Sequence, residues 1–122
     1  MSSYQDLDIY KISLALFYEI HPASLLLPKH ELYELGSQIR RSADSVNSNI
    51  VEGYGRSRYK ADFIRFLVFS HSSCLETKGH LIKINHLYKD LIPDNEKYIT
   101  DYDNLGAKIF NFIKYVENNW KT

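Results

Sequence analysis

The sequence contains few of the residues that interrupt or cross-link a chain: among 122 residues there are five Gly, three Pro and one Cys. The single cysteine, Cys74, cannot form a disulfide within the chain, which fits a reducing compartment. No apolar run is long enough to span a bilayer, and the first residues are polar and acidic, unlike a secretion signal. We therefore expect a cytoplasmic protein that does not enter a membrane.

A net charge of either sign is also missing, since 15 basic and 15 acidic side chains cancel. No overall field therefore draws the chain toward nucleic acid or a membrane surface. The distribution is uneven, however. Residues 38–65 contain six basic and three acidic side chains, and residues 90–104 contain five acidic side chains and one lysine.

Apolar residues recur at the spacing of helix faces in four stretches, at about residues 6–20, 31–53, 59–88 and 94–120. The breaks fall at the few turn signals present, which are HP at 21–22, GYG at 53–55 and IPD at 92–94. The residue before a proline disfavours helix, a glycine can close a helix in a left-handed turn, and Asp94 can cap the last helix. The apolar connection at 23–29 is expected to fold back over the bundle end. The sequence predicts one domain over residues 1–122, an all-α, antiparallel, up-down-up-down four-helix bundle.

Two of the predicted helices have informative apolar faces. The first should bury Leu7, Tyr10, Leu14 and Phe17 on one face. The third has a core stripe and, beside it, a second stripe formed by Ile64, Val68, Leu75 and Ile82. A helix that is apolar over so wide an arc contacts more than one neighbour, so the pattern predicts self-association.

A narrow polar stripe follows the second predicted helix. At about 100° per residue, five polar side chains fall on one line: Gln38, Ser42, Ser45, Asn49 and Glu52. Small hydroxyl residues allow another helix to approach closely, and the longer side chains can hydrogen-bond across the contact. We favour a satisfied polar layer between helices or subunits. A ligand or nucleic-acid contact line, and a plain solvated surface, are the alternatives.

The basic middle of the sequence is the physical argument for nucleic acid. Its cations are Arg40, Arg41, Arg56, Arg58, Lys60 and Arg65. Arginine binds phosphate through two parallel hydrogen bonds, and Tyr54 and Tyr59 could stack on bases between them. The alternative is that Arg40 pairs with Asp44 and Arg58 with Asp62 at i,i+4 spacing while the rest are solvated. Arg56 could instead reach Glu52.

Motifs for catalysis or cofactor binding are not convincing. The GYG at 53–55 follows a helix rather than a strand, so it predicts a helix C-cap and not a phosphate loop. His71 and Cys74 share a helix face, but His80 lies on the opposite side, so a metal would lack converging ligands. We expect no metal, no cofactor, no small-molecule substrate and no enzymatic activity.

Several segments resemble the family of 23S rRNA-intervening-sequence proteins. They are QIRRSA at 38–43, SNIVEGYGR at 48–56 and FIRFL at 63–67, with DLDIY at 6–10, LPK at 27–29 and Ser73, Glu76 and Leu81 further out. The resemblance covers roughly residues 6–87. The chain departs from the family pattern at Tyr10 (often Trp), Asn47 (often Pro), Ser72 (often Gly) and Lys78 (a second Glu), and residues 56–63 are longer by about one residue.

The resemblance implies a small bacterial four-helix bundle, often a homopentamer and often without an assigned function. Some members are encoded inside insertions in large-subunit rRNA genes. A similar fold serves as the accessory variability protein of diversity-generating retroelements, where it engages a reverse transcriptase and RNA through basic surface. We therefore expect a homo-oligomer that binds RNA or an RNA-associated protein. The alternative is an interaction or assembly module with no nucleic-acid role.

Overall fold

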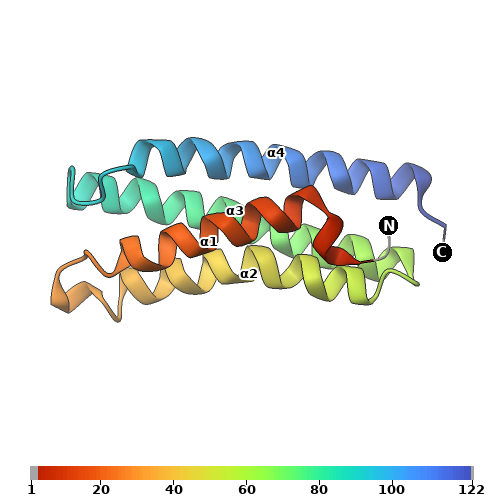
Figure 1. Cartoon of the computed structure of the whole chain (residues 1–122), viewed down its shortest axis with the longest axis horizontal. Helices are drawn as coiled ribbons and strands as arrows, with labels where there is room; N and C mark the ends of the chain where they lie inside the picture. Colours follow the sequence, from red (N-terminus) through yellow and green to blue (C-terminus); the bar gives the residue numbers. More distant parts are fainter. Residues whose placement is uncertain (1–2, 122) are drawn as a thin grey trace.

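The computed structural model describes residues 3–121 and contains four long helices, α1 (Asp8–Ser24), α2 (Leu35–Gly55), α3 (Lys60–Leu87) and α4 (Asn95–Asn119). Two short 3-10 turns, Tyr4–Asp6 and Lys29–Glu31, precede α1 and α2. Figure 1 shows that successive helices run in opposite directions and that both chain ends lie at the end of the bundle where α2 turns into α3. The predicted all-α, up-down-up-down bundle is confirmed. None of the helices described is long and apolar enough to cross a membrane.

The predicted end of the first helix at the 21–22 break is wrong. α1 continues to Ser24 and holds Pro22 within its last turn. Proline lacks an N–H, so only the carbonyl of Tyr18 loses its helical partner, and Tyr18 is exposed and accessible to water. The Ser24 hydroxyl also donates to the His21 carbonyl at 2.7 Å. A proline this close to a helix end therefore costs little.

The predicted left-handed cap at residues 53–55 is also wrong. α2 runs through Gly55, and none of the glycines described has a positive φ. The helix ends when the Arg56 N–H donates to the Gly53 carbonyl at 3.0 Å. Gly53 is buried for another reason, because a Cβ there would lie 3.0 Å from the Cβ of Phe66 on α3. Its role is close approach of two helices.

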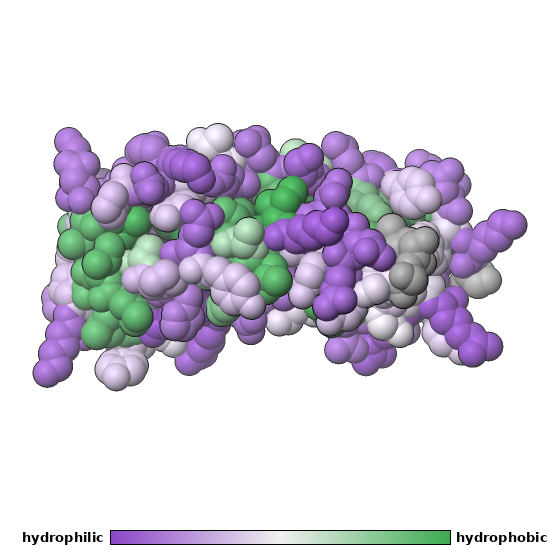
Figure 2. Space-filling view, viewed as in Figure 1, coloured by the Kyte–Doolittle hydropathy of each residue, from purple (hydrophilic) through white to green (hydrophobic). Residues whose placement is uncertain are grey.

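The connections differ from the predictions in detail. Of the leucines expected to fold over the bundle end, Leu27 is buried, but Leu25 and Leu26 are exposed. They contribute to the hydrophobic area at the end where α1 turns into α2 in Figure 2. Asp94 is at the N-cap position of α4, as predicted, but its side chain makes no capping hydrogen bond.

The core lies along the bundle axis between all four helices, and most predicted core positions are buried. The first helix is the exception. Tyr10, Leu14 and Phe17 are only partly buried, and the fully buried line is shifted to Ile9, Ser13, Leu16, Ile20 and Ser24. The reason is that α1 packs closely on α2 but only loosely on α4.

The second stripe of the third helix divides between core and surface. Ile64 packs against the core. The side chains of Val68, Leu75 and Ile82 are exposed by 47%, 57% and 50%. A single copy of the chain therefore leaves this part of the stripe without a covering neighbour.

Candidate nucleic-acid interface

The turn between α2 and α3 is short and rigidly held. The N–H of Tyr59 donates to the Arg56 carbonyl at 2.9 Å, which brings the start of α3 back against the end of α2. From the last helix, the Trp120 indole donates to the Ser57 carbonyl at 2.8 Å. Its ring also packs edge-on against Phe63 at 5.1 Å. Trp120 is therefore an anchor within the bundle.

Arginines and aromatic rings alternate on the outside of this turn. The guanidinium of Arg56 lies 4.9 Å from the centroid of the Phe66 ring, and that of Arg65 lies 5.1 Å from the same ring. Arg65 also lies 5.8 Å from Phe69. At the tip of the turn Arg58 lies over Tyr59 at 5.8 Å. We call these six residues the arginine–aromatic surface: Arg56, Arg58, Tyr59, Arg65, Phe66 and Phe69.

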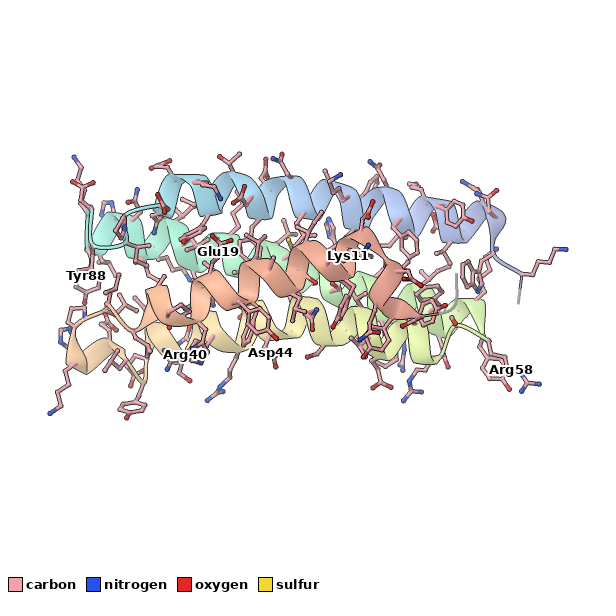
Figure 3. The ribbon with its side chains drawn as sticks, in the orientation of Figure 1. Lys11, Glu19, Arg40, Asp44, Arg58 and Tyr88 are labelled. Carbon is pink, nitrogen blue, oxygen red and sulfur yellow. The ribbon has the colours of Figure 1, made fainter. Side chains whose placement is uncertain are left out.

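The side chains of this surface are open to solvent. The three arginines, Tyr59 and Phe69 are exposed, and Phe66 is half-buried between its neighbours. Figure 3 shows Arg58 projecting away from the end of the bundle. A cation over a ring face is held by the ring quadrupole, so the guanidinium planes are ordered beside the rings while their outer edges stay free to bind.

The charge of the surface is positive. Arg56 binds Glu52 through Nε at 2.7 Å, as one of the sequence alternatives proposed. Both side chains are about half exposed, at 46% and 49%, so the pair is weak and screened by salt. Arg58 lies over Tyr59, and Lys60 begins α3 beside them.

Two of the predicted arginines lie elsewhere. Arg40 does not make the predicted contact with Asp44. Its guanidinium donates to the Ser24 hydroxyl and to the Leu32 carbonyl, both at 2.8 Å, and so ties the α1–α2 connection to α2. Arg41 is exposed but is fifteen residues before Arg56, roughly 22 Å along the helix. The six predicted cations therefore do not form one continuous patch on the surface.

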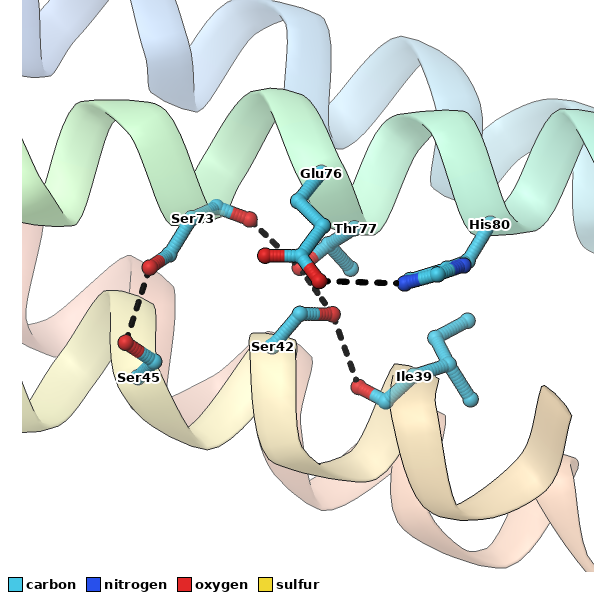
Figure 4. A network of polar contacts seen from close by, with 7 residues as sticks. All are labelled: Ile39, Ser42, Ser45, Ser73, Glu76, Thr77 and His80. Atoms are coloured by element: carbon cyan, nitrogen blue, oxygen red, sulfur yellow. Dashed lines mark hydrogen bonds and ion pairs between the residues drawn. The ribbon is translucent and has the colours of Figure 1, made fainter. Parts of the chain in front are cut away.

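The polar stripe of α2 mainly forms a layer against α3 (Figure 4). Ser45 and Ser73 share a hydrogen bond of 2.8 Å between their hydroxyls. Thr77 Oγ1 lies 2.9 Å from Ser42 Oγ, and Asn49 donates to both oxygens of Ser45 at 2.9 Å.

The two ends of the stripe lie outside this layer. Gln38 is exposed, and Glu52 is exposed and bound to Arg56. The central three residues, Ser42, Ser45 and Asn49, are thus held by bonds within one chain.

The three residues that the sequence analysis compared with a metal site, His71, Cys74 and His80, have separate partners. His71 packs beside Phe110, with ring centroids 6.2 Å apart, while His80 is buried and lies 3.3 Å from Glu76. The Cys74 thiol donates to the Tyr102 carbonyl at 3.1 Å, and burial raises the pKa of this thiol to about 12. Within residues 3–121, no three His, Cys, Asp or Glu side chains gather at a metal-binding distance.

The sequence prediction left out two rings of this surface. Tyr54, named as a ring that could stack on bases, is half-buried and packs edge-on against Phe63 at 6.1 Å. Phe66 and Phe69, which lie beside Arg65, were not singled out. A signal for Phe69 was present, since it follows Arg65 by four positions and so shares its helix face.

Comparison with known families gives one assignment. The family model described as 23S rRNA-intervening sequence protein matches residues 5–111. The match includes α1, α2, α3 and more than half of α4, and therefore the whole arginine–aromatic surface. No curated protein matches the sequence.

Proposed function

The chain belongs to the family of 23S rRNA-intervening sequence proteins, and we propose that it is a non-catalytic, homo-oligomeric bundle that binds RNA through the arginine–aromatic surface. The observation that carries this proposal is the group of three exposed arginines beside three aromatic rings, with guanidinium-to-ring distances of 4.9–5.8 Å. Guanidinium groups bind phosphate oxygens, and aromatic faces stack on bases. Groups for both kinds of contact, with phosphates and with bases, are thus available within one surface.

The same chemistry selects the form of RNA. Stacking needs bases that are not already paired, and the deep, narrow groove of an RNA duplex is closed to side chains. Tyr59 and Phe69 are exposed and would be the stacking rings. We therefore propose single-stranded or looped RNA as the ligand. Repetition of the surface in a homo-oligomer raises the affinity without any new contact, because binding at one copy raises the effective concentration at the next.

The test is a titration with a fluorescent RNA hairpin that has a large loop, repeated over a range of salt concentrations. For single strands, each phosphate contact adds about 0.7 to the slope of log affinity against log salt. We expect R58A with R65A to lower that slope by about 1.4. Removal of the Tyr59 ring (Y59A) should weaken binding by about 5- to 160-fold at constant salt, since one stacked base contributes about 1–3 kcal/mol.

The matched control is R41A, which removes the same charge from an exposed position on α2 outside the surface. It should leave the salt slope and the affinity nearly unchanged. An equal loss in R41A would indicate attraction to the whole protein rather than to this surface. Absence of RNA binding at low salt by the assembled protein would refute the proposal.

A second candidate function is an interaction or assembly module with no nucleic-acid role. The observation that favours it is the exposed apolar stripe of α3 at Val68, Leu75 and Ile82, which RNA would not cover. This function predicts that the complex recovered from cells keeps its composition after nuclease treatment, and that R58A with R65A has no effect on it.

A further inference from the structure

The exposed residues of the α3 stripe form a regular ridge, here called the α3 ridge: Val68, Leu75 and Ile82. They are seven residues apart, so each follows the last by two helical turns, about 10.5 Å, on the same side of the helix. The exposed Phe110 of α4 lies beside the first of them, since both line one hollow. Three exposed apolar side chains in a row, here called knobs, indicate a surface on which another molecule packs.

The seam between α1 and α4 offers three hollows, here called the α1–α4 groove. The first is lined by Leu7, Ile9 and Phe112, the second by Ile12, Leu16 and Leu105, and the third by Ala23, Leu26 and Ile92. Their volumes are about 480, 280 and 360 Å³. A water molecule occupies about 30 Å³, so each hollow is large enough to receive an apolar side chain. Figure 2 shows hydrophobic surface in this seam between hydrophilic rims.

The spacing of the hollows matches the spacing of the knobs. On α1 the three hollows are centred at about residues 8, 14 and 22, which is about seven residues from one to the next. α1 and α3 run in the same direction (Figure 1). A neighbouring α3 lying along the groove parallel to α1 would therefore meet one hollow with each knob.

The knobs and hollows also lie at the same heights along the bundle. Val68 lines a hollow with α4 residues 110–117, and the first groove hollow is lined by α4 residues 108–115. Leu75 lies against α4 residues that include 103 and 106, and the second groove hollow is lined by 101–108. A copy rotated about an axis parallel to the bundle, without a shift along it, thus brings Val68 and Leu75 each opposite a hollow. A contact between two different faces with no rise closes into a ring instead of growing a filament.

The charges of the two faces are complementary. The groove is lined by five acidic side chains and one basic side chain: Asp6, Asp8, Glu19, Asp94, Asp101 and Lys108. Figure 3 shows Glu19 on α1 beside α4. Near Leu75 and Ile82, α3 has two cations, Lys78 and Lys83, and one anion, Glu76. Lys78 is already bound to Asp103 at 2.8 Å, and Asp101 of the groove to Lys97 at 2.8 Å. Complementary fields of this kind favour the face-to-groove encounter over ridge-to-ridge contact.

We propose that a second copy of this chain covers the ridge, with the α3 ridge of each copy packed into the α1–α4 groove of the next and the series closed as a ring. The inference rests on the self-association in the proposed function and names the two surfaces that produce it. RNA takes no part in the contact. Phe66 of the arginine–aromatic surface packs beside Gly53 of α2, whereas Leu75 of the ridge lines a hollow with α4, so the two surfaces are centred on different sides of α3.

Disulfide trapping tests the pairing of the two faces. Under a mild oxidant, a 1:1 mixture of the single variants L75C and A15C should form covalent dimers, because position 15 lines the second hollow. Each single variant alone should stay uncrosslinked, since two different faces never bring like positions together. The double variant L75C/A15C should give a ladder that ends at one size. The native Cys74 is buried and its thiol is not a competing nucleophile.

The opposite results would overturn the proposal. Cross-linking of L75C to itself would mean that two ridges pack face to face. No cross-link in the mixture would mean that the groove is not the partner face. A wild-type protein that sediments as a monomer at micromolar concentration would exclude the ring directly.

Sedimentation of a ridge variant separates this inference from RNA binding. L75E should weaken self-association by about 100-fold or more, because a charge would enter an apolar hollow. The control Y33E introduces the same charge in place of Tyr33, which is 84% exposed and lines none of the three hollows, and should assemble as wild type does. R58A with R65A should lose RNA and keep the assembly. Loss of assembly in that variant and not in L75E would refute the pairing.

Discussion

The α2–α3 interface and the α1–α4 seam are built from opposite kinds of residue. Between α2 and α3 lie glycine, serine and threonine, and the two backbones approach so closely that a Cβ at Gly53 would lie only 3.0 Å from the Cβ of Phe66. Along the α1–α4 seam, the helices pack loosely on each other and leave three hollows. Small residues with satisfied hydroxyls close the first interface, whereas the second is left open.

The α2–α3 interface shows that a polar stripe on a helix need not be a binding surface. A line of serine and asparagine on one helix invites interpretation as a binding surface. Here its central hydroxyls bind one another across the closest contact in the bundle, including Ser45 with Ser73 at 2.8 Å. The apolar surfaces left open lie elsewhere, on α3 and along the α1–α4 seam.

The two regions should differ most in the stability lost when a large side chain is truncated. F63A should lower the free energy of unfolding by about 3–5 kcal/mol, because Phe63 is fully buried between α2, Phe112 and Trp120. I12A, in the open seam, should cost about 1 kcal/mol, since Ile12 is only partly buried. Urea unfolding at low protein concentration measures both. Equal losses would mean that the seam is packed as tightly as the interior.

A smaller difference is expected when two glycines are changed to alanine, since one change should destabilise the fold and the other should stabilise it. G53A should destabilise the fold by about 1–3 kcal/mol, because its Cβ would meet Phe66 at 3.0 Å, and this outweighs the gain in helix propensity. G79A should stabilise it by about 0.5–1 kcal/mol, since no atom lies within 4 Å of a Cβ there. Chemical denaturation reports both values. A stabilising G53A would show that α3 can shift, and the close approach would then not be required.

The smallest expected contrast is in pairwise coupling. A double-mutant cycle on Ser45 and Ser73, each changed to Ala, should give a coupling of about 0.5–1.5 kcal/mol that does not vary with salt. The matched cycle on the exposed pair Lys78 and Asp103 should give less than about 1 kcal/mol and lose it in high salt. Salt dependence in the serine cycle would mean that water reaches the layer.

Most of the fold was accessible from the sequence because helical periodicity is local. Four apolar patterns separated by few breakers predicted four helices, and their bounds were right to within a few residues. The errors arose where a local rule for helix ends did not hold in the folded bundle. Pro22 stayed in α1 because the lost bond faces solvent, and the GYG at 53–55 stayed helical because α3 requires a bare Cα at Gly53.

The candidate surface could be predicted from the sequence only in part. Arg56, Arg58 and Arg65 were identified from charge alone, and the structure brings them together with Phe66 and Phe69. The same charge argument included Arg40, which is bound to the Leu32 carbonyl. Charge is visible in a sequence, but the hydrogen bond that removes an arginine from the surface depends on a connection folded back from another helix.

By itself, the sequence determined the helix count, the alternating direction of the helices and the family, because each depends on periodicity, connection length or motif. The tertiary structure alone decided which polar stripe is interior, which arginines share a surface, and that the knobs of α3 and the hollows between α1 and α4 lie at equal heights. The physical reason is that periodicity specifies which way a side chain faces around its own helix. What lies opposite that side chain depends on how far apart the neighbouring helices are, and that distance is set by the sizes of side chains contributed by both.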